Sequence, residues 1–132
     1  MKPIKPRGGK IDFTIPEMFP LIESGAKHIT IRKHRKNALE VGGILKVYLG
    51  NRFHGAQRYL GTAEILALDK IHFVDRVDYI EIETSFSRKE ELYLLDGFSC
   101  YGDFLHYHRN NQVVGTTRTK QIITFGNQSW LT

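Results

Sequence analysis

Residues 11–32 read IDFTIPEMFPLIESGAKHITIR, and this stretch decides the fold. Its first five residues, 11–15, alternate between apolar and polar side chains and are rich in β-formers, which predicts a strand. Pro16 suits the first turn of a short helix, and Gly25 suits the position that follows a helix C-terminus. Residues 28–32 alternate again and predict a second strand. The stretch is therefore expected to form a strand, a short helix and a strand.

The second of these strands has two different faces. Ile29 and Ile31 share one face and are expected to point into the core. His28, Thr30 and Arg32 share the other face. We therefore look for functional residues on that polar face.

The remainder of the chain alternates turn signals with further strand-like and helix-like segments. Strands are predicted at 44–49, at 58–69 with a continuation at 71–83, and at 119–126, and helices at 87–97, with a Ser87–Glu90 capping box, and at 99–111. Several short strands with few helices are typical of a small barrel. We therefore expect an α+β fold built on a β-barrel of five or six strands with short flanking helices.

Length and composition place the chain among ordinary globular proteins. Its 132 residues correspond to one domain, and 41% hydrophobic with 25% charged residues excludes the disordered, collagen-like and coiled-coil classes. No apolar run is long enough to span a membrane, and the charged first ten residues leave no room for a signal peptide, so a cytoplasmic protein is expected. The single cysteine, Cys100, excludes an intramolecular disulfide and a four-cysteine zinc site.

The positive charge is concentrated in two segments. Residues 1–10 and 27–36 hold nine of the 19 Lys and Arg residues and no acidic residue, whereas the remainder holds ten basic residues against 14 acidic ones. Such a concentration is typical of a site for a phosphate-bearing partner, because each neutralised phosphate releases counterions. The alternative is a basic tail plus a solvated loop. Residues 1–10 are expected to form a mobile basic arm ahead of a single domain at 11–132.

Motifs in three places resemble those of the ASCH superfamily. The run F-x₈-I-x-S-G-x-K-x-x-T-I-R, from Phe13 to Arg32, is similar to the opening motif of that family. Glu40-Val41-Gly42 resembles its x-x-G-D motif, with Gly43 in place of the acid, and Asp96-Gly97-Phe98 with Asp103-Phe104 resembles its (D/E)-G-F…(D/E)-F helix. The resemblance covers roughly residues 11–126. It implies a PUA-like β-barrel whose cleft binds RNA or a modified nucleoside.

Small ASCH members include amidohydrolases that remove the acetyl group of N(4)-acetylcytidine. Their motif holds a lysine and a threonine three residues apart, which Lys27 and Thr30 match, and a distant glutamate, for which Asp96 is the best-aligned residue. The resemblance therefore implies Lys27, Thr30 and Asp96 as catalytic residues. In amide hydrolysis Lys27 would be the base, Thr30 the nucleophile or the holder of the attacking water, and Asp96 the partner of the lysine or the acid for the leaving amine. A ribonuclease that uses the same lysine is an alternative.

Each of these residues also has a structural explanation. Strict alternation puts Lys27 on the side of Ile29, opposite Thr30, so only an irregular turn after Gly25 would bring the two together. Lys27 could instead stabilise the C-terminal end of the preceding helix, and Asp96 could be a surface acid at a helix end. Thr30 could be a strand residue with a satisfied hydroxyl.

The basic segment after the second strand predicts a binding surface for RNA or other single-stranded nucleic acid. Its residues are Arg32, Lys33, Arg35 and Lys36, with Tyr101 added because an aromatic ring beside the residue 96–98 motif can stack on a base. No metal is predicted, because His106 and His108 diverge by about 200° on a helix, and no cofactor is predicted. A protein-interaction domain with an acidic partner is the third alternative.

Overall fold

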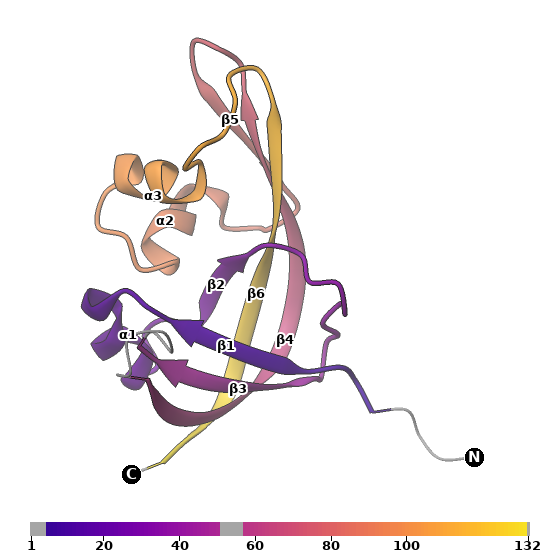
Figure 1. Cartoon of the computed structure of the whole chain (residues 1–132), viewed down its shortest axis with the longest axis vertical. Coiled ribbons are helices and arrows are strands. Elements are labelled where there is room, and N and C mark those ends of the chain that lie inside the picture. The colour runs from indigo at the N-terminus through magenta and orange to yellow at the C-terminus, as the bar shows by residue number, and fades with distance from the viewer. Residues whose placement is uncertain (1–4, 51–56, 132) are drawn as a thin grey trace.

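The computed structural model describes residues 5–50 and 57–131. Its strands are β1 (Gly9–Phe13), β2 (Ile29–Arg32), β3 (Ile44–Leu49), β4 (Arg58–Asp75), β5 (Ile80–Thr84) and β6 (Thr117–Trp130). Its helices are α1 (Phe19–Glu23), α2 (Leu92–Leu95) and α3 (Tyr101–His108), with 3₁₀ turns at Pro16–Met18 and Lys89–Glu91 (Figure 1). The fold is therefore α+β, as predicted.

The six strands form one mixed sheet. The strand order is β1-β3-β4-β6-β2, and β5 pairs with the second half of β4. β1 and β3 are parallel, and the other pairs are antiparallel. β4 and β6 span 18 and 14 residues and run along the molecule, while β1 and β3 cross them near one end (Figure 1). The long β4–β6 pair therefore joins the end of the sheet that holds β1 and β3 to the end that holds β5.

The sheet is not closed into a barrel, which corrects the predicted architecture. β1 and β2 stand at the two ends of the strand path, and they do not pair with each other in the part of the chain that the structure describes. Side chains lie between these edges instead, since the Arg32 guanidinium lies over the Phe13 ring, 4.9 Å from its centroid. Phe13 ends β1 and Arg32 ends β2. This stack takes the place of backbone pairing at the seam between β1 and β2.

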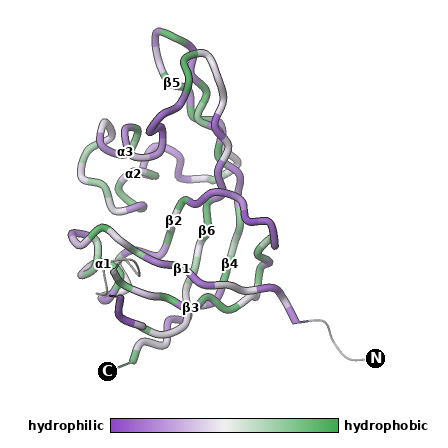
Figure 2. Tube along the Cα trace, in the orientation of Figure 1, coloured by the Kyte–Doolittle hydropathy of each residue, from purple (hydrophilic) through white to green (hydrophobic). Residues whose placement is uncertain are grey.

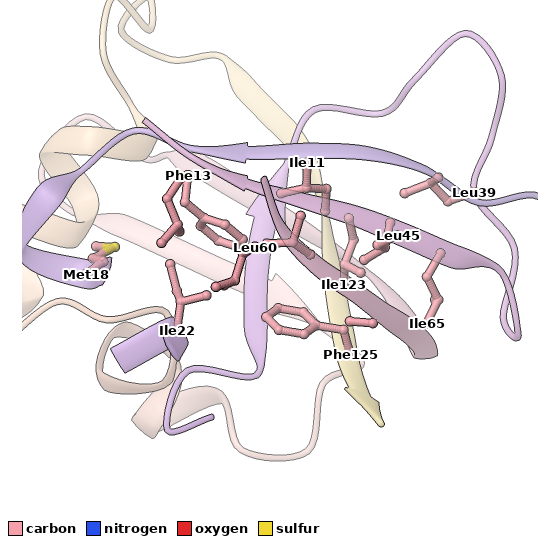
Figure 3. Close-up of a cluster of buried hydrophobic side chains, with 13 residues drawn as sticks. Ile11, Phe13, Met18, Ile22, Leu39, Leu45, Leu60, Ile65, Ile123 and Phe125 are labelled. Atoms are coloured by element: carbon pink, nitrogen blue, oxygen red, sulfur yellow. The ribbon is translucent and has the colours of Figure 1, made fainter. Parts of the chain in front are cut away.

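Two hydrophobic clusters hold the sheet and the helices together. The first packs β1, β3 and the first half of β4 against Ile22 of α1 (Figure 3). The second packs Ile29 and Ile31 of β2 against Leu92 of α2 and Phe104 of α3. Ile29 and Ile31 are 1% and 4% exposed, which confirms that they belong to the core. The loop that follows β2 is hydrophilic by contrast (Figure 2).

The helices are shorter than the patterns predicted. The predicted helix at 87–97 consists of a 3₁₀ turn and α2, and the predicted Ser87–Glu90 capping box does not form, because no side chain caps the turn that begins at Lys89. The strand at 44–49 is confirmed, whereas the predicted 58–69 strand continues to Asp75 and β5 begins only at Ile80. Among the described helices, none combines the length and the apolarity that a membrane crossing requires.

The N-terminal segment contributes more to the sheet than predicted. β1 begins at Gly9 and so takes in the last two residues of the predicted arm. The Arg7 N–H donates to Oε1 of Glu40, and the Glu40 N–H donates to the Arg7 carbonyl, each at 2.9 Å. A Cβ at Gly8 would lie 1.9 Å from the carbonyl oxygen of Ile44, so this close approach requires glycine. Residues 1–4 of the predicted arm lie outside the described residues.

Candidate functional site

A pocket opens at the seam between β1 and β2. Its empty space is about 370 Å³ with the open mouth included, of which about 30 Å³ is accessible to the centre of a water molecule. Lys27, Thr30 and Asp96 all line it, and Phe13 and Tyr107 contribute aromatic walls. The structure therefore brings the three predicted catalytic residues to one pocket.

Lys27 reaches the pocket because the chain turns irregularly between α1 and β2. Gly25 has φ = +82°, a conformation that favours glycine, and the Lys27 N–H donates to the Leu21 carbonyl at 2.9 Å. Lys27 precedes the first residue of β2 and is not bound by the alternation of that strand. This is the irregular turn that the sequence pattern required for Lys27 and Thr30 to lie on the same side.

The Lys27 ammonium is buried among three acceptors. Its Nζ donates to the Ile29 carbonyl at 2.7 Å, to Oδ1 of Asp96 at 2.8 Å and to the backbone carbonyl of Asp96. The residue is only 3% exposed, and burial lowers its pKa below that of a free lysine, while the Asp96 carboxylate opposes this shift. Three acceptors match the three N–H groups of an ammonium. Lys27 can therefore act as a base only after it gives up one of these contacts.

Asp96 connects Lys27 to a histidine. Asp96 directly follows the last residue of α2, and Gly97, with φ = +99°, turns the chain at that point. Oδ1 of Asp96 faces Lys27, and Oδ2 lies 2.7 Å from Nε2 of His108. Asp96 is only 4% exposed, which excludes the alternative that it is a surface acid at a helix end. Its carboxylate instead bridges two buried nitrogen groups.

The polar chain continues from His108 to Lys120 of β6. Nζ of Lys120 lies 2.9 Å from Nδ1 of His108. A lysine ammonium only donates, so Nδ1 accepts and the proton of the neutral ring is assigned to Nε2, which donates to Asp96. Burial lowers the pKa of His108, which agrees with a neutral ring. Lys27, Asp96, His108 and Lys120 thus form one continuous hydrogen-bonded chain.

Thr30 lies beside this chain and is paired with Arg32. The Nε of Arg32 donates to Oγ1 of Thr30 at 3.0 Å, and Thr30 is 3% exposed. Burial lowers the pKa of Arg32, yet an arginine in this position remains charged at neutral pH. Because Oγ1 already accepts a hydrogen bond, its own proton is available to a base. The neighbouring guanidinium would stabilise negative charge that develops on or near that oxygen.

The predicted nucleic-acid-binding residues do not share one surface. Arg32 lies in the pocket, and Arg35 donates from Nη2 to the Lys10 carbonyl and so helps to hold β1. Lys33 and Lys36 are exposed on the loop that follows β2. Of the four basic residues, only these two therefore project into solvent.

Tyr101 lies away from the pocket, in a separate depression that it shares with Tyr79 and Tyr93. Tyr107, six residues later in α3, lines the pocket instead. Six residues of helix correspond to about 9 Å along the axis, so the two ends of α3 serve different surfaces. Tyr107 is the aromatic residue positioned to contact a ligand in the pocket.

Sequence reasoning did not assign His108 and Lys120 to the site. His108 follows the buried Phe104 by four residues, a spacing that puts both on one helix face. Lys120 alternates with the buried Ile122, which puts a lysine on an inward face of β6. A histidine or lysine at a buried position of an otherwise apolar helix or strand face was the sequence signal that could have identified these two residues. Among the described residues, no group of three or more His, Cys, Asp and Glu side chains has an arrangement suited to a metal ion.

Lys120→Met is expected to raise the melting temperature at neutral pH. Lys120 is 8% exposed, and burial, with Arg118 nearby, lowers its pKa to about 8. Between about pH 8 and the pKa of a free lysine, roughly 10.4, the unfolded chain therefore binds more protons than the folded chain. The charged Lys120 thus lowers the free energy of unfolding by its full amount below pH 8, and this destabilisation decreases as the pH rises above 8. Thermal melts of the variant and the parent should differ most at neutral pH and converge as the pH approaches about 10. A variant that melts below the parent at neutral pH would contradict this expectation.

Comparison with known proteins agrees with the fold. No protein-family model and no curated protein matches the sequence. Among solved structures, the chain is similar to the crystal structure of ASCH from Zymomonas mobilis, with a TM-score of 0.55 and 16% sequence identity. The match covers 92% of this chain and 68% of that chain. The chain therefore has the ASCH fold, which is the fold that its sequence motifs imply.

Proposed function

We propose that the pocket binds a modified nucleoside and hydrolyses an N-acyl group on its base, the reaction of the ASCH amidohydrolases that act on N(4)-acetylcytidine. The observation that carries this proposal is the convergence of Lys27, Thr30 and Asp96 in one pocket. A buried lysine with a lowered pKa beside a nucleophile candidate is typical of catalytic sites. Tyr107, which lines the pocket and is exposed, supplies aromatic surface for a planar base.

The chemistry needs a nucleophile, a proton acceptor and a stabiliser of negative charge. The Thr30 hydroxyl, or a water that it holds, attacks the acyl carbonyl carbon, and its proton passes to Lys27 in the neutral amine form. The Arg32 guanidinium, whose Nε donates to Oγ1 of Thr30 at 3.0 Å, lies beside the point of attack and would stabilise the oxyanion on the acyl carbonyl oxygen through its charge and its other N–H groups. The C–N bond breaks, and Lys27 returns the proton to the leaving nitrogen. If Thr30 is the nucleophile, water then hydrolyses the acyl ester, and the products are acetate and the free amino nucleoside.

Binding without turnover is the second candidate function. The observation that favours it is the set of three protein acceptors around Nζ of Lys27, which stabilises the protonated and non-basic form. In that case the pocket recognises a base, and the exposed Lys33 and Lys36 contact phosphates of an RNA. The two candidates use the same pocket and differ in the protonation state of Lys27.

One assay separates these functions. The protein is incubated with N(4)-acetylcytidine and, separately, with a short single-stranded RNA, and acetate release, strand scission and binding are followed. Acetate release that depends on Lys27 supports the amidohydrolase. Binding of either ligand without turnover supports the second candidate, and strand scission supports the ribonuclease alternative. If the protein neither binds nor converts either compound, both proposals are wrong.

A further inference from the structure

We propose that a solvent-open depression next to the pocket is a phosphate-binding site. It is lined by three basic residues, Lys33, Arg118 and Lys120, and by His106, Tyr107, Asn110 and Asn111. No acidic residue is among the described residues that line it. The lining comes from the loop after β2, from the end of α3 with the turn that follows it, and from β6. Lysine, arginine and amide donors around an open space are the groups that bind phosphate oxygens.

The basic side chains of this depression make no direct contact with a carboxylate in the part of the chain that the structure describes. Within residues 5–50 and 57–131, no salt bridge involves Lys33, Arg118 or Lys120. Basic side chains elsewhere, such as Arg58 and Arg109, are paired with acids at 2.8 and 2.7 Å. An anion from solution would therefore be the first negative group in direct contact with these side chains.

Arg118 is held in position by the end of α3. Its Nη1 donates to the carbonyl of His108 at 3.2 Å and to the carbonyl of Asn110 at 2.7 Å. Helix C-terminal carbonyls repel anions, so their pairing with Arg118 removes an obstacle to phosphate. The remaining N–H groups of the guanidinium are not used in these two contacts. Arg118 can thus present a fixed charge to a ligand with little further loss of side-chain conformational entropy.

Lys120 has the same kind of fixed position. One of its three N–H groups is directed to Nδ1 of His108, which leaves two for a ligand. Arg118, Lys33 and Arg32 all lie close enough to disfavour its charge, and Asp96 acts in the opposite direction. A buried cation among other cations is costly. A bound phosphate would offset that cost, which is a second reason to place an anion here.

The depression adjoins the pocket, because Tyr107 lines both. If the pocket binds a nucleoside as proposed above, a phosphate on that nucleoside can reach the depression past the Tyr107 ring. The preferred substrate would then be a nucleotide or an RNA end rather than a free nucleoside. This part of the inference rests on the proposed function, whereas the phosphate site itself does not.

The test compares the binding of cytidine, cytidine 5′-monophosphate, cytidine 3′-monophosphate and inorganic phosphate by calorimetry at low and moderate salt. At least one monophosphate should bind about tenfold more tightly than cytidine, and inorganic phosphate should compete with it. Lys33→Met and Arg118→Gln should each reduce the preference for the monophosphate over cytidine by a factor of about three to ten. Lys33 is exposed, so its substitution should leave the fold intact. The matched control is Lys46→Met, which removes an exposed lysine from β3 and should leave the preference unchanged.

Equal affinity for cytidine and both monophosphates together with no binding of inorganic phosphate, or a preference that survives Lys33→Met and Arg118→Gln, would overturn the phosphate site. Acetate release can be measured separately with acetylated cytidine and its monophosphates. Turnover without any preference for the phosphorylated substrate would retain the proposed function and reject this site. Lys33-dependent phosphate binding without acetate release would retain this site and reject the proposed function. Binding of inorganic phosphate alone, without a monophosphate preference, would assign the site to free phosphate and reject its link to the pocket.

Discussion

Asp96→Ala is expected to lower the free energy of unfolding by about 3–5 kcal/mol, because it leaves the buried Lys27 ammonium without its carboxylate. His108 loses its acceptor at the same time. For a chain of this size the loss corresponds to a fall in melting temperature of roughly 10 °C or more. Chemical denaturation and thermal melting at neutral pH measure it directly. This is the largest effect on stability that we expect from a single substitution.

Two further variants separate charge pairing from simple loss of a side chain. Asp103→Ala removes an exposed acid from α3 and is expected to change stability by about 0.5 kcal/mol or less. The double variant Lys27→Met with Asp96→Leu removes both buried charges and is expected to be more stable than Asp96→Ala alone. If the double variant is no more stable than Asp96→Ala, an unpaired charge is not the cause of the loss.

Lys27→Met is expected to lower acetate release from N(4)-acetylcytidine by at least ~100-fold, as expected for the loss of a general base. Thr30→Val keeps the shape of the side chain and removes the hydroxyl, so a comparable loss is expected if Thr30 is the nucleophile or holds the water. Asp96→Glu should also lose activity, because Asp96 holds Lys27 through both its carboxylate and its own carbonyl. A longer side chain would displace at least one of these contacts.

The activity of each variant has to be measured on protein that is shown to be folded, and beside a measurement of substrate binding. Lys27→Met that still binds N(4)-acetylcytidine within a few-fold, but no longer converts it, would assign Lys27 to the chemistry. The exposed Lys46→Met serves as the control and should retain turnover. Unchanged acetate release in Lys27→Met would exclude Lys27 as the base, and the pocket would then serve binding alone.

Local patterns were sufficient for the elements that depend on neighbouring residues. The alternation of residues 28–32 predicted the burial of Ile29 and Ile31, and the apolar run at 44–49 predicted β3. Gly25 predicted the end of the first helix, because only a residue that tolerates a positive φ fits there. The motif resemblance implied both the ASCH fold and the set Lys27, Thr30 and Asp96, which the structure places in one pocket.

The sequence by itself thus determined the strand and helix periods, the core face of β2 and the identity of the three candidate catalytic residues. Only the tertiary structure decided that the sheet stays open at the seam between β1 and β2, that Arg32 turns into the pocket while Lys33 faces solvent, and that His108 and Lys120 extend the polar chain. Each of these features depends on contacts between residues that are distant in sequence, such as His108 of α3 and Lys120 of β6. A periodic pattern states which face a residue occupies, but the partner on that face is set by long-range packing.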